Sequence, residues 1–258
     1  MEDVILFAVV GFLAQLVDGA LGMAFGLVSS TVLLSFGVLP ATASASVHVA
    51  EMFTTAASGA SHFLHRNVNY KTFLRLAPAG VVGGALGVYV VTGIDGAVLR
   101  PFVAAYLGLM GIVVLYRVTR SPQPPPKQHS APYTAALGTV GGFADAIGGG
   151  GWGPIVSSTL MASGGEPHYV IGTENAAEFL VTVAISAAFA WSLFTGHWEE
   201  AGAISDHAGA VGGLIIGGMV AAPVASYVVK LVSPRKLGIA VGTLILVMAA
   251  YQTWQLVG

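Results

Sequence analysis

Apolar residues fill long, nearly uninterrupted blocks of the chain. A helix needs about 20 mainly apolar residues to cross the hydrocarbon core of a bilayer. Six blocks have that length and contain few charged residues: 41–65, 72–92, 97–117, 168–194, 205–230 and 236–257. We predict one transmembrane helix over each of them.

Two further apolar blocks, 4–38 and 131–163, are too long for a single crossing. Each is interrupted near its middle by a glycine-rich break that begins at an acid: the breaks run from Asp18 to Gly26 and from Asp145 to Pro154. Consecutive glycines and a proline end a helix. We therefore expect each block to be a hairpin of two helices of about 14 residues, which is shorter than a span.

Composition agrees with a membrane protein. Hydrophobic residues make up 55% of the 258 residues and charged residues 9%, whereas about 25% of a soluble domain is charged. So few charges cannot coat a soluble core of this size, and lipid is the expected solvent. The predicted fold class is an all-α polytopic protein of the inner (plasma) membrane.

Three other features of composition narrow the function. The net charge of −2 gives no reason to expect a nucleic acid partner, and the absence of cysteine excludes disulfides and thiolate chemistry. The N-terminal Met1-Glu2-Asp3 lacks the basic region of a signal peptide. The first apolar block is therefore expected to belong to the mature protein.

Short matches relate the two halves of the chain. They occur in the same order and at nearly constant separation: Val28-Ser29-Ser30-Thr31 with Val156-Ser157-Ser158-Thr159, Ala50-Glu51 with Ala177-Glu178, and Gly83-Gly84 with Gly217-Gly218. This pattern indicates duplication. We predict a first repeat over 1–117, a proline-rich linker over 118–130 and a second repeat over 131–258.

The basic residues predict how the repeats are oriented. If each broken block is a hairpin, each half crosses the membrane three times and the repeats are inverted. Nine of the ten basic residues then lie on one side, within 65–75, 117–130 and 230–236. The positive-inside rule places the linker in the cytoplasm and both termini outside. Two full crossings per broken block would give the same sidedness, so ten spans remain an alternative, although the short half-helices favour re-entrant hairpins.

The glycine-rich breaks are the first candidate site. Non-helical backbone at membrane depth is tolerated only inside the protein or beside a wet cavity. Inverted hairpins would bring their turns together, and the helix N-termini after the turns would offer N–H groups to an anion. The expected substrate contacts are Gly22, Met23, Gly26, Ser29, Gly150, Gly151, Trp152, Gly153, Ser157 and Asn175. The competing interpretation is that the glycines only allow close packing.

Ionisable residues inside apolar blocks are the second candidate. Charges at membrane depth are costly, so such groups usually have a function. Glu51 and Glu178 are equivalent in the two repeats, and His48 and Asn175 each precede them by one helical turn. We predict that protons are coupled to transport through Glu51, Glu178, His48, Asp18 and Asp145. These groups could instead hold helices together, and the two aspartates could cap half-helices.

Familiar chemical motifs are missing. The chain has no Gly-x-x-x-x-Gly-Lys-Ser/Thr phosphate loop and no His-Glu-x-x-His or Gly-x-Ser-x-Gly signature. We therefore expect neither an ATP-driven pump nor an enzyme, and no cofactor. A divalent metal carrier remains an alternative, because His48, Glu51, Glu174, Asn175 and Glu178 offer nitrogen and oxygen ligands.

Several of these segments together resemble the sulfite exporter TauE/SafE family: the broken hairpin from Gly11 to Gly26, the run from Ser46 to Ala60, the basic turn from His65 to Tyr70, and Gly83 to Gly87. The resemblance implies a secondary transporter of sulfite, sulfoacetate or a related organosulfonate. The partners would be a small anionic solute and the bilayer, and a homodimer is left open. The sequence departs from the pattern at Ser46-Val47-His48, where a start like Gly172-Thr173 is expected, and by carrying Glu51, Glu174 and Glu178 inside the bundle.

Overall fold

The structure, a computed structural model, describes residues 2–119, 129–198, 207–231 and 234–257. These residues form helices joined by short turns, with no strand in the described ranges. In chain order the helices are α1 (Glu2–Leu21), α2 (Phe25–Ser35), α3 (Pro40–Leu64), α4 (Tyr70–Thr92), α5 (Gly96–Thr119), α6 (Ala131–Gly148), the π-helix η1 (Gly153–Ser157), α7 (Ser158–Ala162), α8 (Pro167–Phe194), α9 (Ala208–Leu231) and α10 (Pro234–Val257). The predicted all-α membrane fold is confirmed.

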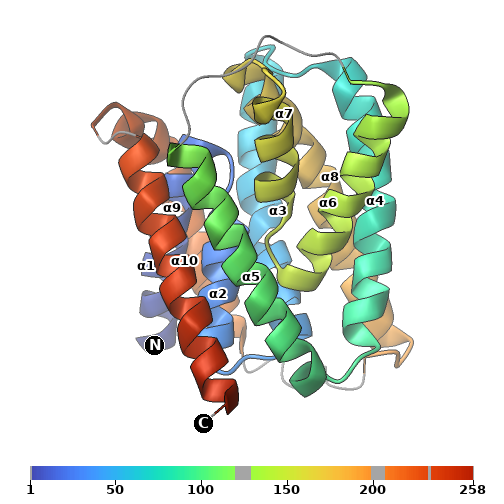
Figure 1. Ribbon diagram of the computed structural model, residues 1–258, viewed down its shortest axis with the longest axis vertical. Coiled ribbons are helices and arrows are strands. Elements are labelled where there is room, and N and C mark those ends of the chain that lie inside the picture. Colours follow the sequence, from blue (N-terminus) through green and yellow to red (C-terminus); the bar gives the residue numbers. More distant parts are fainter. Residues whose placement is uncertain (1, 120–128, 199–206, 232–233, 258) are drawn as a thin grey trace.

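The two broken blocks form hairpins of unequal arms. The first arms, α1 and α6, have 20 and 18 residues, while α2 has 11 and the stretch of η1 and α7 has five plus five. The expectation of equal arms of about 14 residues is therefore wrong. A return arm of 11 residues rises only about 16 Å, which is too short for a hydrocarbon core of about 30 Å. Figure 1 shows α6 and α7 turning back inside the bundle.

The main helix contacts join one half of the chain to the other. Helix α1 packs along α9, α4 along α6, α5 along α10, and α3 along α8. In the two repeats, α1 corresponds to α6, α4 to α9, α3 to α8 and α5 to α10. The α1–α9 contact therefore has its counterpart in the α4–α6 contact, whereas α3–α8 and α5–α10 each join two corresponding helices. The matched glycines lie in these contacts: Gly83 of α4 packs against the backbone of Thr139, and Gly217 of α9 against that of Ala8. Small residues thus allow helices from the two halves to approach closely.

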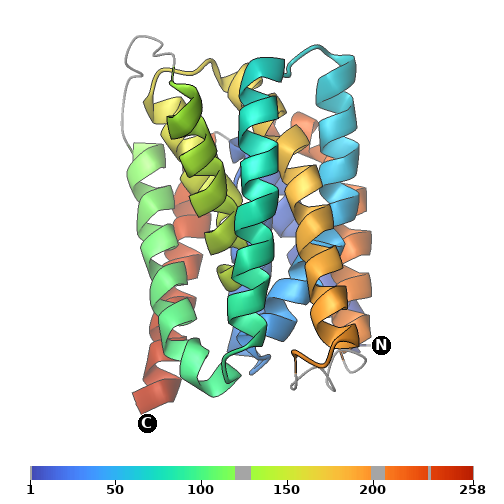
Figure 2. The same cartoon turned by 90° about the vertical axis from the view of Figure 1, so that its right-hand side faces the viewer.

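The two ends of the molecule differ. Both termini lie at one end, and the helix ends that flank the linker lie at the other (Figures 1 and 2). The turn between α3 and α4, which contains Arg66, and the start of α10, which contains Lys236, lie at the linker end. Most of the linker, 120–128, falls outside the described residues.

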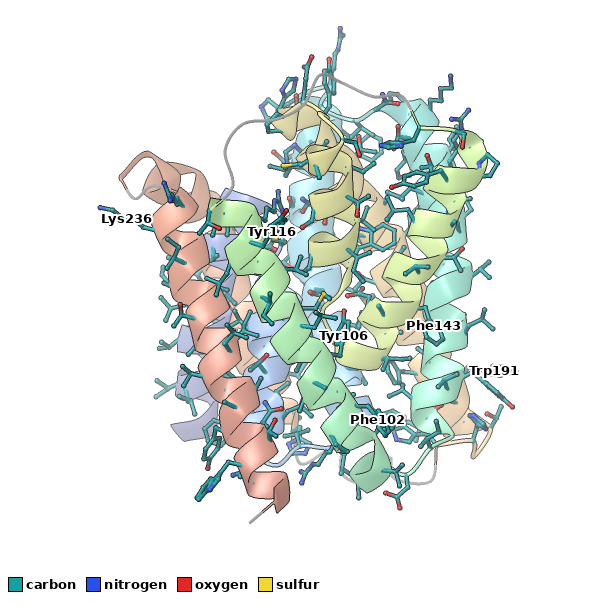
Figure 3. All side chains as sticks on the ribbon, viewed as in Figure 1. Phe102, Tyr106, Tyr116, Phe143, Trp191 and Lys236 are labelled. Carbon is teal, nitrogen blue, oxygen red and sulfur yellow. The ribbon has the colours of Figure 1, made fainter. Side chains whose placement is uncertain are left out.

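Four helices in the described part of the chain are long and apolar enough to cross a membrane: Tyr70–Thr92, Gly96–Thr119, Pro167–Phe194 and Arg235–Gln255. Their outer faces carry apolar side chains such as Phe102 and Trp191, which point away from the bundle (Figure 3). Helix α3 has 25 residues but is not among the four. It contains the buried polar residues Ser44, Ser46, His48, Glu51, Thr54 and Thr55. Its polarity marks it as a helix that faces the interior of the bundle.

Candidate functional site

The first hairpin turn is closed by Asp18 and Gly22. The N–H of Gly22 donates to the backbone carbonyl of Asp18 at 2.6 Å, with Gly22 at a φ of +65°. This left-handed conformation suits glycine at the end of a helix. The Asp18 carboxylate then accepts hydrogen bonds from the N–H groups of Ala24 (2.8 Å) and Phe25 (3.4 Å). Asp18 therefore caps the N-terminus of α2.

The second hairpin turn repeats this construction. The N–H of Gly149 donates to the carbonyl of Asp145 at 2.7 Å, and Gly149 also has a φ of +65°. The Asp145 carboxylate accepts from the N–H groups of Gly151 (2.7 Å) and Trp152 (3.1 Å). In both turns an aspartate carboxylate thus occupies the positively polarised helix N-terminus at which the sequence analysis predicted a bound anion.

The two turns touch each other through glycine backbone. A Cβ atom added at Gly26 would lie 2.7 Å from the Cα of Gly150, and one at Gly150 would clash with the backbone of Gly26. The hydroxyl of Ser30 donates to the carbonyl of Gly149 at 2.6 Å, and that of Ser44 to the carbonyl of Ala146 at 2.6 Å. Close packing therefore accounts for Gly26 and Gly150 and joins the first half to the second turn.

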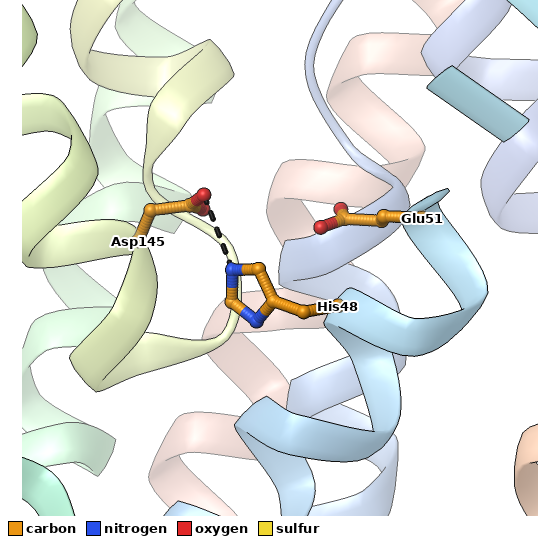
Figure 4. Close-up of side chains that lie close together, drawn as sticks. All are labelled: His48, Glu51 and Asp145. Atoms are coloured by element: carbon orange, nitrogen blue, oxygen red, sulfur yellow. Dashed lines mark hydrogen bonds and ion pairs between the residues drawn. The ribbon is translucent and has the colours of Figure 1, made fainter. Parts of the chain in front are cut away.

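Three titratable side chains meet beside this contact. His48 and Glu51 project from α3, and Asp145 projects from the end of α6 toward them (Figure 4). His48 Nε2 lies 3.2 Å from Asp145 Oδ2, and one ligand atom from each of the three residues lies within 4.8 Å of the others. Their exposed fractions are 0%, 4% and 1%, so all three side chains are buried inside the bundle. The structure thus brings together three of the five residues predicted to couple protons.

The hydrogen bonds of His48 determine how this cluster can hold a proton. Nδ1 lies 2.7 Å from the carbonyl oxygen of Ser44, which can only accept, so Nδ1 carries a hydrogen. In a neutral ring Nε2 then has a lone pair. The bond to Asp145 requires one additional proton, either on Nε2 or on the carboxyl group. The hydrogen bond between His48 and Asp145 therefore contains one shared proton.

Glu51 lies next to this pair and against the turn contact. Its Oε1 would be 2.7 Å from a Cβ atom at Gly26, and its buried Oε2 has no hydrogen-bond partner among the described residues. An unpaired buried carboxylate is costly, whereas a protonated carboxyl group or a nearby cation relieves the cost. The cluster could accept either a proton or a divalent cation on geometry alone.

A second acidic group faces the first turn. Glu174 of α8 is buried, and its Oε2 would lie 3.8 Å from a Cβ atom at Gly22. The side-chain amide of Asn175 donates to this oxygen at 3.2 Å and to the carbonyl of Ile171 at 3.0 Å. Glu178 is half-buried one helical turn further along α8. The sequence match pairs Glu178 with Glu51, yet it is Glu174 that contacts a hairpin turn.

The remaining predicted contacts lie within the walls of the two hairpins. Ser29 and Ser157 are fully buried. The Ser29 hydroxyl has no hydrogen-bond partner in the described ranges, whereas the Ser157 hydroxyl lies beside the carboxyl group of Glu174. Trp152 is also fully buried and packs against Gly80 of α4 and Gly141 of α6. Gly153 packs against Met23, which brings the first turn to the start of η1. Ser29 thus offers a free donor, whereas Trp152 fills the contact between α4 and α6.

Three side chains that contact the hairpin turns were not predicted from the sequence as site residues. Ser44 supports both His48 and the second turn, and Tyr106 of α5 points at that turn (Figure 3), its hydroxyl donating to the carbonyl of Gly150 at 3.5 Å. Arg117, assigned by its position to the basic linker region, points its guanidinium at Met23 and Met161. Ser44 could have been predicted, because it lies one helical turn before His48 on the same face. The sequence contains no pattern that predicts that the side chains of Tyr106 and Arg117 point into the bundle.

A cavity of about 590 Å³ opens at the linker end of the molecule. It is lined by Asn69, Lys71, Thr72, Arg75, His129, Thr134, Leu160, Gly165, Glu166, Tyr169, Val170 and Thr173. Two of these residues are permanently cationic and one is acidic. Such a lining attracts anions.

Comparisons with known proteins identify the family. A family model described as "Sulfite exporter TauE/SafE" matches residues 7–252. A Bacillus subtilis (strain 168) protein named "Probable membrane transporter protein YtnM" is 40% identical over 255 residues, which is 97% of this chain and 82% of that protein. No solved structure matches the chain significantly. The match along nearly the whole chain, on a bundle of apolar helices with two glycine turns in contact, shows that the protein belongs to the TauE/SafE sulfite exporter family of membrane transporters.

Proposed function

We propose that this protein is a proton-coupled secondary transporter of a small sulfur-containing anion: sulfite, sulfoacetate or a related organosulfonate. Membership of the family supports transport and this class of solute. Proton coupling is supported by one observation above the others, the enclosed group of His48, Glu51 and Asp145 where the two hairpin turns touch. The solute crosses chemically unchanged.

The proposed mechanism starts from the charge balance at the turns. Asp18, Glu51, Asp145 and Glu174 lie close to the two hairpin turns, and a further anion is repelled while all are ionised. Protonation of Glu51 and of the His48–Asp145 pair reduces this repulsion to that of Asp18 and Glu174. The anion then binds, and release of the protons on the other side drives it out. Coupling of this kind makes the pH gradient the source of energy.

The proposed movement is a rocking of one half against the other. The repeats over 1–117 and 131–258 are taken as inverted copies, with the linker in the cytoplasm and both termini outside. The pairing of α1 with α9 and of α4 with α6 supports two related halves. The solute would lie between the hairpins, where Gly22, Gly150, Ser29, Ser157 and Asn175 are within the walls. Alternating access through such an interface is the usual mechanism of duplicated transporters.

Flux measurements test the proposal. The purified protein is reconstituted into liposomes, and uptake of sulfite and of sulfoacetate is followed with and without a pH gradient. We expect uptake that rises with the gradient and a loss of that rise in the double variant Glu51→Gln, Glu178→Gln. If the uptake rate is the same with and without the pH gradient, and the same in the wild type and the double variant, the proton role is ruled out.

The metal carrier is not favoured by the family. Its sequence-based ligand set is only partly assembled, because His48 and Glu51 meet Asp145, whereas Glu174 faces the other turn. A direct control is to add divalent cations to the flux assay. Saturable uptake of a metal ion that sulfite does not inhibit would replace the anion proposal.

A further inference from the structure

One cation lies inside the bundle near the first hairpin turn. Arg117 is in the last turn of α5, next to Tyr116, which Figure 3 marks near the linker end of that helix. Its side chain is half-buried. Nη1 donates to the sulfur of Met23 at 2.8 Å, and Nη2 donates to the sulfur of Met161 at 2.8 Å. The guanidinium thus bridges the first turn and α7.

These sulfur atoms are poor partners for a guanidinium. Arginine keeps its charge and presents a planar fork of N–H donors, whereas a thioether is only a weak acceptor. Glu174 interacts with Arg117 electrostatically, but no carboxylate in the described ranges forms an ion pair with it within 4.0 Å. A cation at such a place usually pairs with negative charge. Among the described residues, the guanidinium N–H groups of Arg117 therefore meet only weak hydrogen-bond acceptors.

Two serine hydroxyl groups lie close to the Met23 sulfur or to Glu174, both of which interact with Arg117. The Ser158 hydroxyl lies 3.9 Å from the Met23 sulfur, and the neighbouring Ser157 hydroxyl is buried beside the carboxyl group of Glu174. A fork of guanidinium donors with adjacent hydroxyls matches an oxyanion that presents two or three oxygens on one atom. Sulfite and sulfonates have that shape.

We propose that Arg117 is the residue that recognises the transported anion on the linker side of the protein. This inference rests on the proposed function and names the side chain that holds its substrate. Anion oxygens replace the sulfurs of Met23 and Met161 as acceptors of the Nη1 and Nη2 hydrogens. The two methionines hold the guanidinium in place between transport events and release it at small cost, because the bonds that they accept are weak.

The cavity at the linker end fits this placement. Its lining includes Leu160, and the next residue of α7, Met161, contacts Arg117. The cavity also contains Thr173, whose neighbour Glu174 interacts with Arg117. Lys71 and Arg75 at the cavity wall raise the local concentration of anions. The cavity therefore borders the same segments of α7 and α8 that interact with Arg117.

Substitution of Arg117 tests the inference in proteoliposomes. Arg117→Gln is expected to raise the KM for sulfite and sulfoacetate about ten- to a hundredfold, the loss typical of charge-assisted hydrogen bonds. Arg117→Lys keeps the charge but loses the fork, so a smaller rise is expected. Arg235→Gln is the matched control, since this exposed arginine lies at the start of α10 at the linker end. An unchanged KM in Arg117→Gln would overturn the inference.

Two results separate this inference from the proposed function. If the wild-type protein moves no sulfur anion, the function fails; if it does so and Arg117→Gln keeps the wild-type KM, only the role of Arg117 fails. Chemical rescue of Arg117→Cys distinguishes a loss of anion recognition from misfolding, because the natural chain has no cysteine that would also react. Alkylation of that thiol by 2-bromoethylamine, with loss of bromide, restores a cationic side chain. We expect it to recover much of the lost affinity, while a failure of rescue in folded protein would count against recognition by charge.

Discussion

The two hairpin turns have the same backbone but different surroundings. In each turn an aspartate caps the second arm, and a glycine four residues after it adopts a φ of +65°. The second turn is enclosed by Ser30, Ser44, His48 and Tyr106, and Asp145 is 1% exposed. The first turn instead lies near Arg117 and Glu174, and Asp18 is half-buried. The same turn structure therefore occurs in two different side-chain environments.

This difference points to a division of roles. His48 and Asn175 occupy matched positions, and each side chain hydrogen-bonds the carbonyl four residues before it, in Ser44 and Ile171. An imidazole nitrogen can bind a proton, whereas a side-chain amide cannot. Under the proposed function, the second turn would bind the proton and the first would contact the charged solute.

The largest effect is expected where the turns touch. A Cβ atom at Gly150 would overlap the backbone of Gly26 and Leu27, so Gly150→Ala must separate the turns. We expect a loss of about 3 kcal/mol or more in stability, at the upper end of overpacking, and no transport. The measurements are the melting temperature in detergent and the flux. Gly212→Ala is the control, because a Cβ there meets no atom within 4 Å; equal effects of the two changes would contradict the contact.

The two capping aspartates differ in their partners, because only Asp145 pairs with a histidine. Asp145→Asn removes the acid that pairs with His48, whereas Asp18→Asn removes only a cap charge. Breaking a buried pair costs about 3 kcal/mol, and weakening a cap costs about 1 kcal/mol. Melting temperatures of the two variants in detergent should therefore fall unequally, with Asp145→Asn lower. Equal decreases in melting temperature would show that the two aspartates contribute equally to stability.

His48→Asn exchanges the histidine for the residue that its matched position carries. The amide can keep the bond to the Ser44 carbonyl but cannot carry a proton. We expect solute binding to persist while uptake no longer responds to a pH gradient, measured as the ratio of fluxes with and without that gradient. Asn175→Gln serves as a control for changes at the other turn. A gradient response that survives in His48→Asn would remove the proposed difference between the turns.

The smallest expected effect concerns the link between the halves. Ser30→Ala deletes the hydrogen bond to the Gly149 carbonyl and should lower stability by about 1 kcal/mol. Ser29→Ala is the comparison for stability, since its hydroxyl has no partner among the described residues. Thermal unfolding in detergent measures both. A larger loss in Ser29→Ala than in Ser30→Ala would mean that the hydrogen bond across the turns contributes little.

Much of the fold follows from the order of residues along the chain. Apolar blocks, glycine breaks and basic connections are local patterns, and lipid demands continuous helices that satisfy their own backbone groups. The sequence therefore determined the helices, the positions of both hairpin turns and the family. It did not determine the arms of the hairpins, because α1 and α6 continue through their glycines to Leu21 and Gly148.

Only the tertiary structure decided which side chains meet. Ser30 and Gly149 are 119 positions apart, and His48 and Asp145 are 97 apart, so no local pattern pairs them. Their meeting depends on the rotation of each helix against a partner from the other half. The same rotation aims Arg117 at Met23 rather than at the linker and places Glu174, not Glu178, at the first turn. Periodicity predicts that a helix forms, but packing between the halves sets the direction in which each side chain points.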